Sequence, residues 1–128
     1  MRVICALLSL YLAESALASP PESSKGITAD GRVVVSQYKT SPPWAADIVE
    51  HPKPQLPPAE RAKKQGGEGF FRVILDVRTG KVRDVVVQRS SGYAAIDANV
   101  VRALRQWRLR PGKWREFEIH VALYTHPR

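Results

Sequence analysis

The sequence predicts an α+β domain with a small three-stranded antiparallel sheet, one long helix packed on one face, and a short N-terminal helix. Apolar residues alternate with polar ones in residues 70–77 and 117–124, which is typical of strands with one buried face. Between these segments, apolar residues recur every three or four positions from Ile96 to Trp107, which indicates an amphipathic helix. The order helix, strand, strand, helix, strand predicts a split β-α-β crossover and the strand order 2-1-3.

Residues 1–18 have the features of a cleaved signal peptide. A short positive start precedes an apolar run over residues 3–12, and Ala16-Leu17-Ala18 provides the small residues that signal peptidase requires. The run is shorter than the roughly 20 apolar residues that span a bilayer. We therefore expect a mature protein that begins at Ser19 and resides in the periplasm, and an uncleaved membrane anchor remains the alternative.

The cysteine content and the net charge indicate how the mature chain is stabilised and which partners it meets. Cys5 is the only cysteine and lies within the expected signal peptide, so the mature chain has no disulfide to stabilise it. The net charge is +8. An exported basic protein meets anionic lipids, cell-wall polymers and acidic protein segments, and we expect no nucleic acid partner. The alternative is that the charge only keeps the domain soluble.

Residues 19–53 are expected to form an N-terminal tether. Residues 19–31 are rich in Ser, Pro and Gly and show no apolar periodicity. Within the tether, residues 32–38 suit a short strand and residues 41–49 a single helical turn. The four prolines of residues 51–58 impose an extended chain, and the main domain is expected over residues 54–128.

The main domain begins with helix formers at residues 59–65, which end at Gly66-Gly67. A turn at residues 78–81 then joins the first two strands, and the uneven spacing of Val82, Val85 and Val87 indicates a bulge or a twist near the turn. Pro111-Gly112 ends the long helix, on which Trp107 is expected to be buried. The predicted core consists of the apolar residues on the inner faces: Phe71, Val73, Leu75, Val85, Val87, Ile96, Val100, Leu104 and Trp107.

The sequence contains no pattern that indicates catalysis or a bound cofactor. Ser90 and Ser91 are potential nucleophiles, but no histidine and carboxylate accompany them at the spacing of a triad. Because both serines precede the long helix, a role in satisfying its free N–H groups is favoured. His120 and His126 lack an acidic or thiol partner at metal-ligand spacing. We expect neither an enzyme nor a metal site.

The ordered set of motifs from residue 54 to residue 124 resembles the C-terminal domain of TonB proteins. A basic segment with Ala62 precedes Gly66-Gly67-Glu68-Gly69, and residues 76–82 read Asp-Val-Arg-Thr-Gly-Lys-Val. These are followed by Val85-x-Val87, Ser90-Ser91-Gly92, Ile96-Asp97, Arg102 and Trp107-Arg108-Leu109-Arg110-Pro111. One difference lies at the start of the domain, where Leu56-Pro57-Pro58 stands in place of the family's Tyr-Pro at a shifted spacing.

The resemblance implies a protein-binding function. In TonB domains a short segment of an outer-membrane transporter pairs with the edge of the final strand, and Arg61 matches a basic position that reaches the partner. An outer edge strand has free N–H and C=O groups that suit such strand addition. The expected partner-binding residues are therefore Glu116, Phe117, Glu118, Ile119, His120, Val121, Ala122, Leu123, Tyr124 and Arg61. Closure of this edge by residues 32–38 or by a second copy in a homodimer is the alternative.

TonB energy transducers also have a transmembrane anchor and a long proline-rich spacer. In this sequence a signal-like segment and a modest lead-in take their place, which separates binding from energy transduction. Two further hypotheses remain open. The domain is an electrostatic adaptor that docks on an anionic envelope polymer or lipid surface, or a full energy transducer if residues 1–18 are retained as an anchor.

Overall fold

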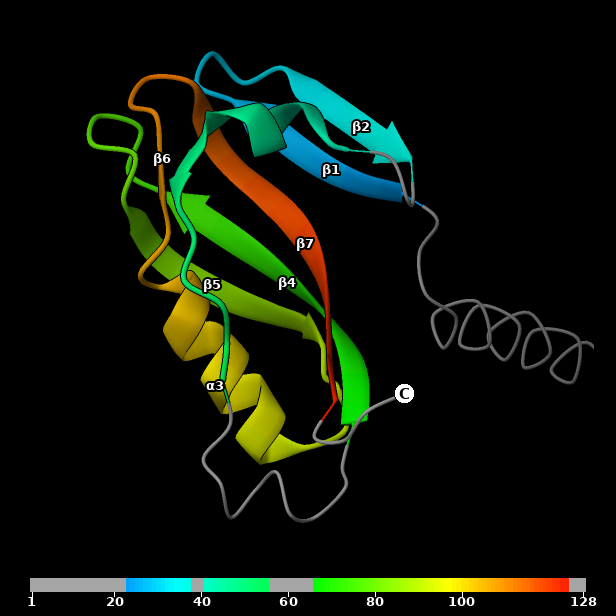
Figure 1. Ribbon diagram of the computed structural model, residues 1–128. Coiled ribbons are helices and arrows are strands. Elements are labelled where there is room, and N and C mark those ends of the chain that lie inside the picture. Colours follow the sequence, from blue (N-terminus) through cyan, green and yellow to red (C-terminus); the bar gives the residue numbers. More distant parts are fainter. Residues whose placement is uncertain (1–22, 38–40, 56–65, 125–128) are drawn as a thin grey trace, which may run out of the picture.

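The chain folds around a five-stranded antiparallel sheet in the order β2-β1-β7-β4-β5 (Figure 1). The computed structural model describes residues 23–37, 41–55 and 66–124. The strands of this sheet are β1 (Ser23–Thr28), β2 (Val33–Gln37), β4 (Gly66–Leu75), β5 (Val82–Arg89) and β7 (Trp114–Tyr124).

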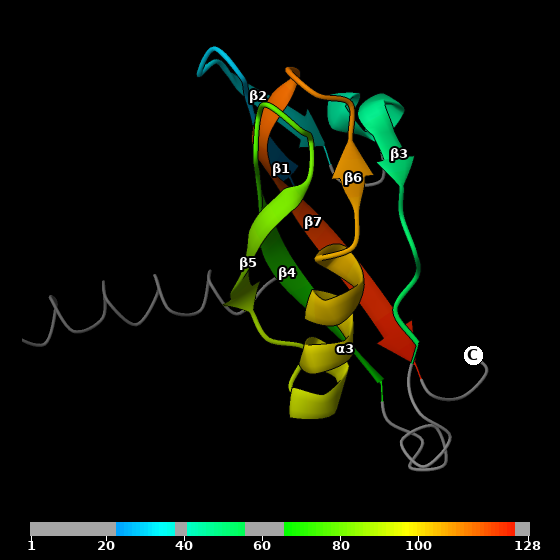
Figure 2. The same cartoon turned by 90° about the vertical axis from the view of Figure 1, so that its left-hand side faces the viewer.

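One face of the sheet is covered by α3 (Ala94–Leu104), as Figure 2 shows. The short helix η1 (Pro43–Asp47) and a two-stranded sheet of β3 (Ile48–Glu50) and β6 (Arg108–Leu109) complete this layer. Side chains from all these elements meet the sheet in one hydrophobic core. Neither helix in the described part of the chain is long and apolar enough to cross a membrane.

The α+β class is confirmed, but the predicted three-stranded sheet is wrong. β4 does pair with β5 on one side and with β7 on the other, and the sheet then continues past β7 into the β1–β2 hairpin. The expected tether therefore belongs to the folded domain wherever it is described. The strand Ser23–Thr28 was missed because it contains mainly small and polar residues, so it has no alternation of large apolar side chains.

Trp44 joins the N-terminal segment to the sheet. It is 2% exposed and stacks on Phe117 at a ring-centre distance of 6.0 Å. It also meets the edge of Trp114 at 5.7 Å, and the Trp114 Nε1–H donates to Asp47 at 2.7 Å. Gly26 leaves the room for this packing, because a Cβ there would lie 2.5 Å from Trp44 Cε3. The partner that buries β1 is thus an indole from another element.

The core contains all the expected residues except Val87 and Trp107. Val87 is 41% exposed and lies on β5, which is the outermost of the described strands. The core also contains buried residues of η1, β4, β6 and β7 that the predicted core did not include: Trp44, Phe70, Leu109, Trp114 and Phe117.

Trp107 lies beyond the end of α3 and is only partly buried. Its indole is roughly parallel to the Phe117 ring at 6.5 Å, and its Nε1–H donates to the carbonyl of Pro52 at 2.9 Å. The helical stripe was extended one turn too far, because Trp107 follows Leu104 by a helical interval. The residue instead bridges the core and the segment at residues 51–55. The predicted helix at residues 59–65 lies outside the described residues.

Ser90 and Ser91 hold the turn that leads into α3. Both hydroxyls donate to the Asp97 carboxylate, at 2.5 and 2.7 Å, and the Ser91 N–H donates to it at 2.9 Å. Partial burial raises the pKa of Asp97, but these hydrogen bonds outweigh it, so the pKa lies below its ordinary value. The two serines therefore fix the helix start through Asp97, and this use of their hydroxyls is structural.

Asp97→Asn is expected to make the free energy of unfolding depend less steeply on pH under acidic conditions. A lowered carboxyl pKa in the folded state stabilises the fold above the ordinary carboxyl pKa of about 4 and ceases to do so as the pH falls through the lowered value. Urea unfolding at a series of pH values measures this. The wild-type protein should lose stability more steeply than the variant below about pH 4. Parallel curves for the two proteins would contradict the role assigned to Asp97.

Candidate partner-binding site

The outer edge of β7 is divided into two parts by the β1–β2 hairpin. β1 pairs with the first part, with Gly26 opposite Phe117 and Ile27 opposite Glu116. Phe117 is fully buried, and Glu116 forms an ion pair with Arg72 at 3.7 Å. The expectation that Glu116 and Phe117 offer a free edge is therefore wrong, because a strand of the same chain already occupies it.

Beyond Phe117, β1 and β7 diverge, as Figure 1 shows. Within the described residues their register ends at Gly26 and Phe117. The next N–H of β1, from Lys25, donates to the side chain of Glu118 at 2.8 Å. Residues 118–124 of β7 still pair with β4 on the inner side. Among the described strands, none pairs with their outer side.

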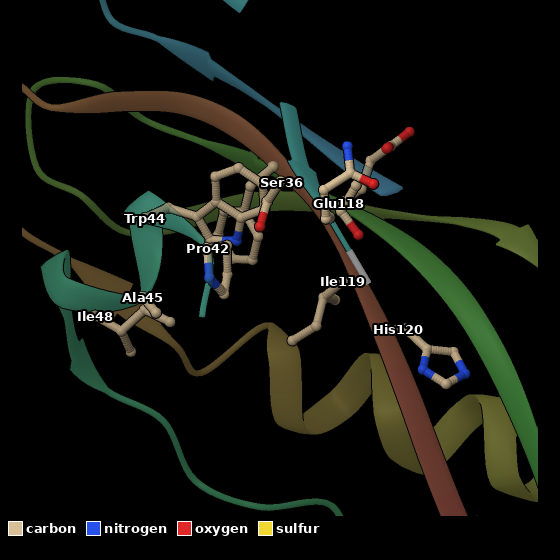
Figure 3. Close-up of a pocket in the computed structure, with 11 residues that line it drawn as sticks. Ser36, Pro42, Trp44, Ala45, Ile48, Glu118, Ile119 and His120 are labelled. Carbon is tan, nitrogen blue, oxygen red and sulfur yellow. The ribbon is translucent and has the colours of Figure 1, made fainter. Parts of the chain in front are cut away.

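A groove of about 450 Å³ lies where the two strands separate (Figure 3). It is bounded by the ends of the hairpin, by η1 and by the middle of β7. The apolar part of its lining comes from Pro42, Trp44, Ala45, Ile48, Phe117 and Ile119, and the polar part from Ser24, Ser36, Gln37, Glu118 and His120. The groove thus runs beside the part of β7 that β1 leaves open.

The polar side chains of β7 at this site are held in place by their neighbours. Glu118 accepts a second hydrogen bond from the Gln88 amide at 3.0 Å. The His120 Nε2 lies 2.7 Å from the Glu68 carboxylate, and its ring stacks on Phe70 at 4.7 Å with 17% of the side chain exposed. Because His120 alternates with the buried face of the final strand, the sequence predicts that it is exposed, but the ring of Phe70 on the adjacent strand covers it. Both side chains therefore present a fixed polar surface.

The remaining predicted site residues are placed as follows. Ile119 and Val121 pack partly against the core, and Ala122 is exposed. Leu123 and Tyr124 belong to β7, but their side chains lie outside the description, as does all of Arg61. The η1 residues of the groove were missed. The one signal for them is a tryptophan among prolines at residues 42–44, which is unusual in a tether.

The described residues form no metal-binding cluster at this site. Across residues 23–37, 41–55 and 66–124, no three His, Cys, Asp or Glu side chains come together as a metal ion would require. The arrangement is that of an open sheet edge beside an apolar groove, which suits an extended polypeptide.

A family model described as Gram-negative bacterial TonB protein C-terminal matches residues 52–124. The chain belongs to the TonB C-terminal family. A solution NMR structure of the Pseudomonas aeruginosa TonB CTD is similar at a TM-score of 0.48 and 20% identity, over 60% of this chain and 81% of that chain. Comparison with curated proteins gives no match.

TonB C-terminal domains are non-enzymatic interaction modules of the Gram-negative periplasm, and they interact with outer-membrane transporters. The matched residues supply β4, β5, α3, β6 and β7 of this TonB domain. The hairpin, η1 and β3 lie before the matched range. The groove is therefore formed on one side by the family's final strand and on the other by a segment outside the family model.

Proposed function

We propose that this TonB domain binds an extended segment of an outer-membrane transporter, or of another envelope protein, by β-strand addition to residues 118–124. The observation that carries the proposal is the end of the β1–β7 pairing at Phe117, which leaves an edge beside the groove. An edge strand of this kind has outward N–H and C=O groups at alternate residues, and these give affinity for an incoming strand.

The groove also predicts the character of the bound segment. A strand added about 4.8 Å from β7 directs alternate side chains to opposite faces of the sheet. One set meets the apolar surface of Trp44, Ala45 and Ile48, and the other faces Glu118 and His120. The segment is therefore expected to carry apolar residues at every second position. The hairpin limits its pairing to the part of β7 beyond Phe117.

Such binding needs no energy source. Energy transduction also requires a link to an inner-membrane motor, and cleavage of residues 1–18 as a signal peptide removes the apolar segment that would supply one. We therefore assign binding to the domain, with the periplasm as its location. Retention of residues 1–18 would add the transducer function without changing the binding site.

Ala45→Arg is expected to weaken binding of a transporter segment at least about tenfold, a loss of about 1.4 kcal/mol. The long side chain fills the groove from η1, where Ala45 is part of the lining. Ala46→Arg is the matched control, because Ala46 is the next residue of η1, is exposed and does not line the groove. Fluorescence anisotropy with a labelled peptide from the periplasmic N-terminal segment of an outer-membrane transporter measures both affinities.

Backbone pairing is tested separately with N-methylated peptides. Methylation of alternate residues blocks the N–H groups on one side of the peptide strand only. One of the two alternating patterns should therefore abolish binding while the other leaves it nearly unchanged. Equal effects of both patterns, or equal affinities of Ala45→Arg and Ala46→Arg, would contradict strand addition at this site. A competing homodimer would appear as affinity that falls with increasing protein concentration.

A further inference from the structure

Three turns of the sheet are joined at one end of the molecule (Figures 1 and 2). They are the β1–β2 turn at 29–32, the β4–β5 turn at 76–81 and the β6–β7 turn at 110–113. The Ala29 N–H donates to the carbonyl of Lys113 at 3.0 Å, and the Gly112 N–H donates to that of Val77 at 2.7 Å. These backbone bonds connect the three turns into one surface, which we call the turn platform.

The turn platform and Arg115, the β7 residue next to it, carry an excess of positive charge. Their basic side chains are exposed, and none forms an ion pair with a described residue: Arg32, Arg78, Lys81, Arg110, Lys113 and Arg115. The Arg115 guanidinium donates to the carbonyl of Ala29 at 3.1 Å. These cations are therefore available to a partner.

The carboxylates near the turn platform are already engaged by the fold. Asp76 accepts from the backbone N–H of Arg78 at 2.9 Å, and Asp47 accepts from Trp114 at 2.7 Å. Asp30 accepts from the Thr28 hydroxyl, a hydrogen bond that lowers the pKa of this exposed carboxyl. This surface thus has three carboxylates and six basic side chains, and its net charge is positive.

We propose that the turn platform docks on a membrane surface that carries anionic phospholipid headgroups. Charge complementarity identifies the partner class, since each basic residue near such a surface strengthens binding roughly fivefold. Val33, which is 54% exposed beside Arg32, adds apolar contact with the interface. The inference is independent of strand addition, because the open part of β7 lies toward the other end of the sheet (Figure 1).

The same end of the molecule argues against an anionic polymer as the occupant. A polymer chain would be held in a cleft, and the cavity at this end has a volume of about 330 Å³. Its lining includes Asp30 and Asp47 beside Arg32 and Lys113. The carboxylates repel an anionic chain inside the cavity, whereas the exposed cations of the turns meet a planar array of phosphates without entering it.

The test is sedimentation of the full chain with vesicles of phosphatidylcholine alone or mixed equally with phosphatidylglycerol. Binding to the mixed vesicles is expected, with loss as salt is raised. The double variant Arg78→Glu with Lys113→Glu should bind at least about tenfold more weakly. Its control is Lys53→Glu with Arg102→Glu, which changes the net charge equally at exposed positions beside α3 and should bind as the wild-type does.

Residues 1–22 are identical in all these proteins, so any binding through that segment contributes equally to each of them. Three results would overturn the proposal. They are equal binding to both vesicle types, equal loss in the two double variants, and binding to a soluble anionic polysaccharide without binding to the mixed vesicles. The second would indicate diffuse charge attraction, and the third would indicate a polymer partner.

Discussion

Trp44→Ala should lower the free energy of unfolding by about 3–5 kcal/mol, as expected for removal of a buried large aromatic side chain. Trp44 is 2% exposed, and it contacts β1 at Gly26 and β7 at Phe117. A domain of this size has about 5–15 kcal/mol of stability in total, so the loss is a large part of it. Chemical denaturation followed by tryptophan fluorescence and by circular dichroism measures the loss.

Two further variants separate docking of the N-terminal segment from general damage. Gly26→Ala should cost about 1–3 kcal/mol, because its Cβ would lie 2.5 Å from the Trp44 ring. Val35→Ala on the neighbouring strand should cost about 0.5 kcal/mol or less, because Val35 is 55% exposed. If Trp44→Ala and Gly26→Ala are as stable as Val35→Ala, residues 23–37 and 41–50 do not pack on the sheet as the structure shows.

Gly80→Ala should lower the free energy of unfolding by about 2–4 kcal/mol. Gly80 has a φ of +77°, and a Cβ there would lie 1.9 Å from the carbonyl oxygen of Leu109. Relief of this clash requires movement of backbone and loss of the 2.8 Å hydrogen bond from the Leu109 N–H to Gly80. Because this bond joins the β4–β5 turn to β6, the variant should also loosen the turn platform. Denaturation and amide hydrogen exchange at Leu109 measure these effects.

Gly112→Ala is the matched control for Gly80→Ala. Gly112 has nearly the same φ, +79°, but a Cβ there would meet nothing within 4 Å. Only the conformational cost of a positive φ applies, which is about 1–2 kcal/mol. The difference between the two variants thus isolates the steric contact with Leu109. Equal stabilities would show that β6 does not approach Gly80 so closely.

The candidate site lies along only part of the strand that the sequence predicted, and its binding role stays a prediction. The alternation from Phe117 onward identified β7, and the resemblance identified it as the binding strand of the family. The open stretch at residues 118–124 became visible only when the end of the β1 register was known. The apolar wall of the groove comes from Trp44, Ala45 and Ile48, which no periodic pattern connects to β7.

The sequence by itself determined the family, the helix and the strands of the matched region. These elements carry their signal locally, since the stripe from Ile96 to Leu104 and the alternation from Phe71 to Leu75 are set by the period of each backbone conformation. The turn at Gly80 was likewise predicted, because its positive φ favours glycine.

The tertiary structure alone decided that residues 23–37 and 41–50 pack on the sheet and where along β7 the pairing with β1 ends. β1 is buried by the indole of Trp44 against Gly26, a contact between elements that a local pattern cannot record. His120 is covered by Phe70 of the neighbouring strand for the same reason. Burial of a strand depends on what lies across the sheet and above it, and those neighbours are brought together only by long-range packing.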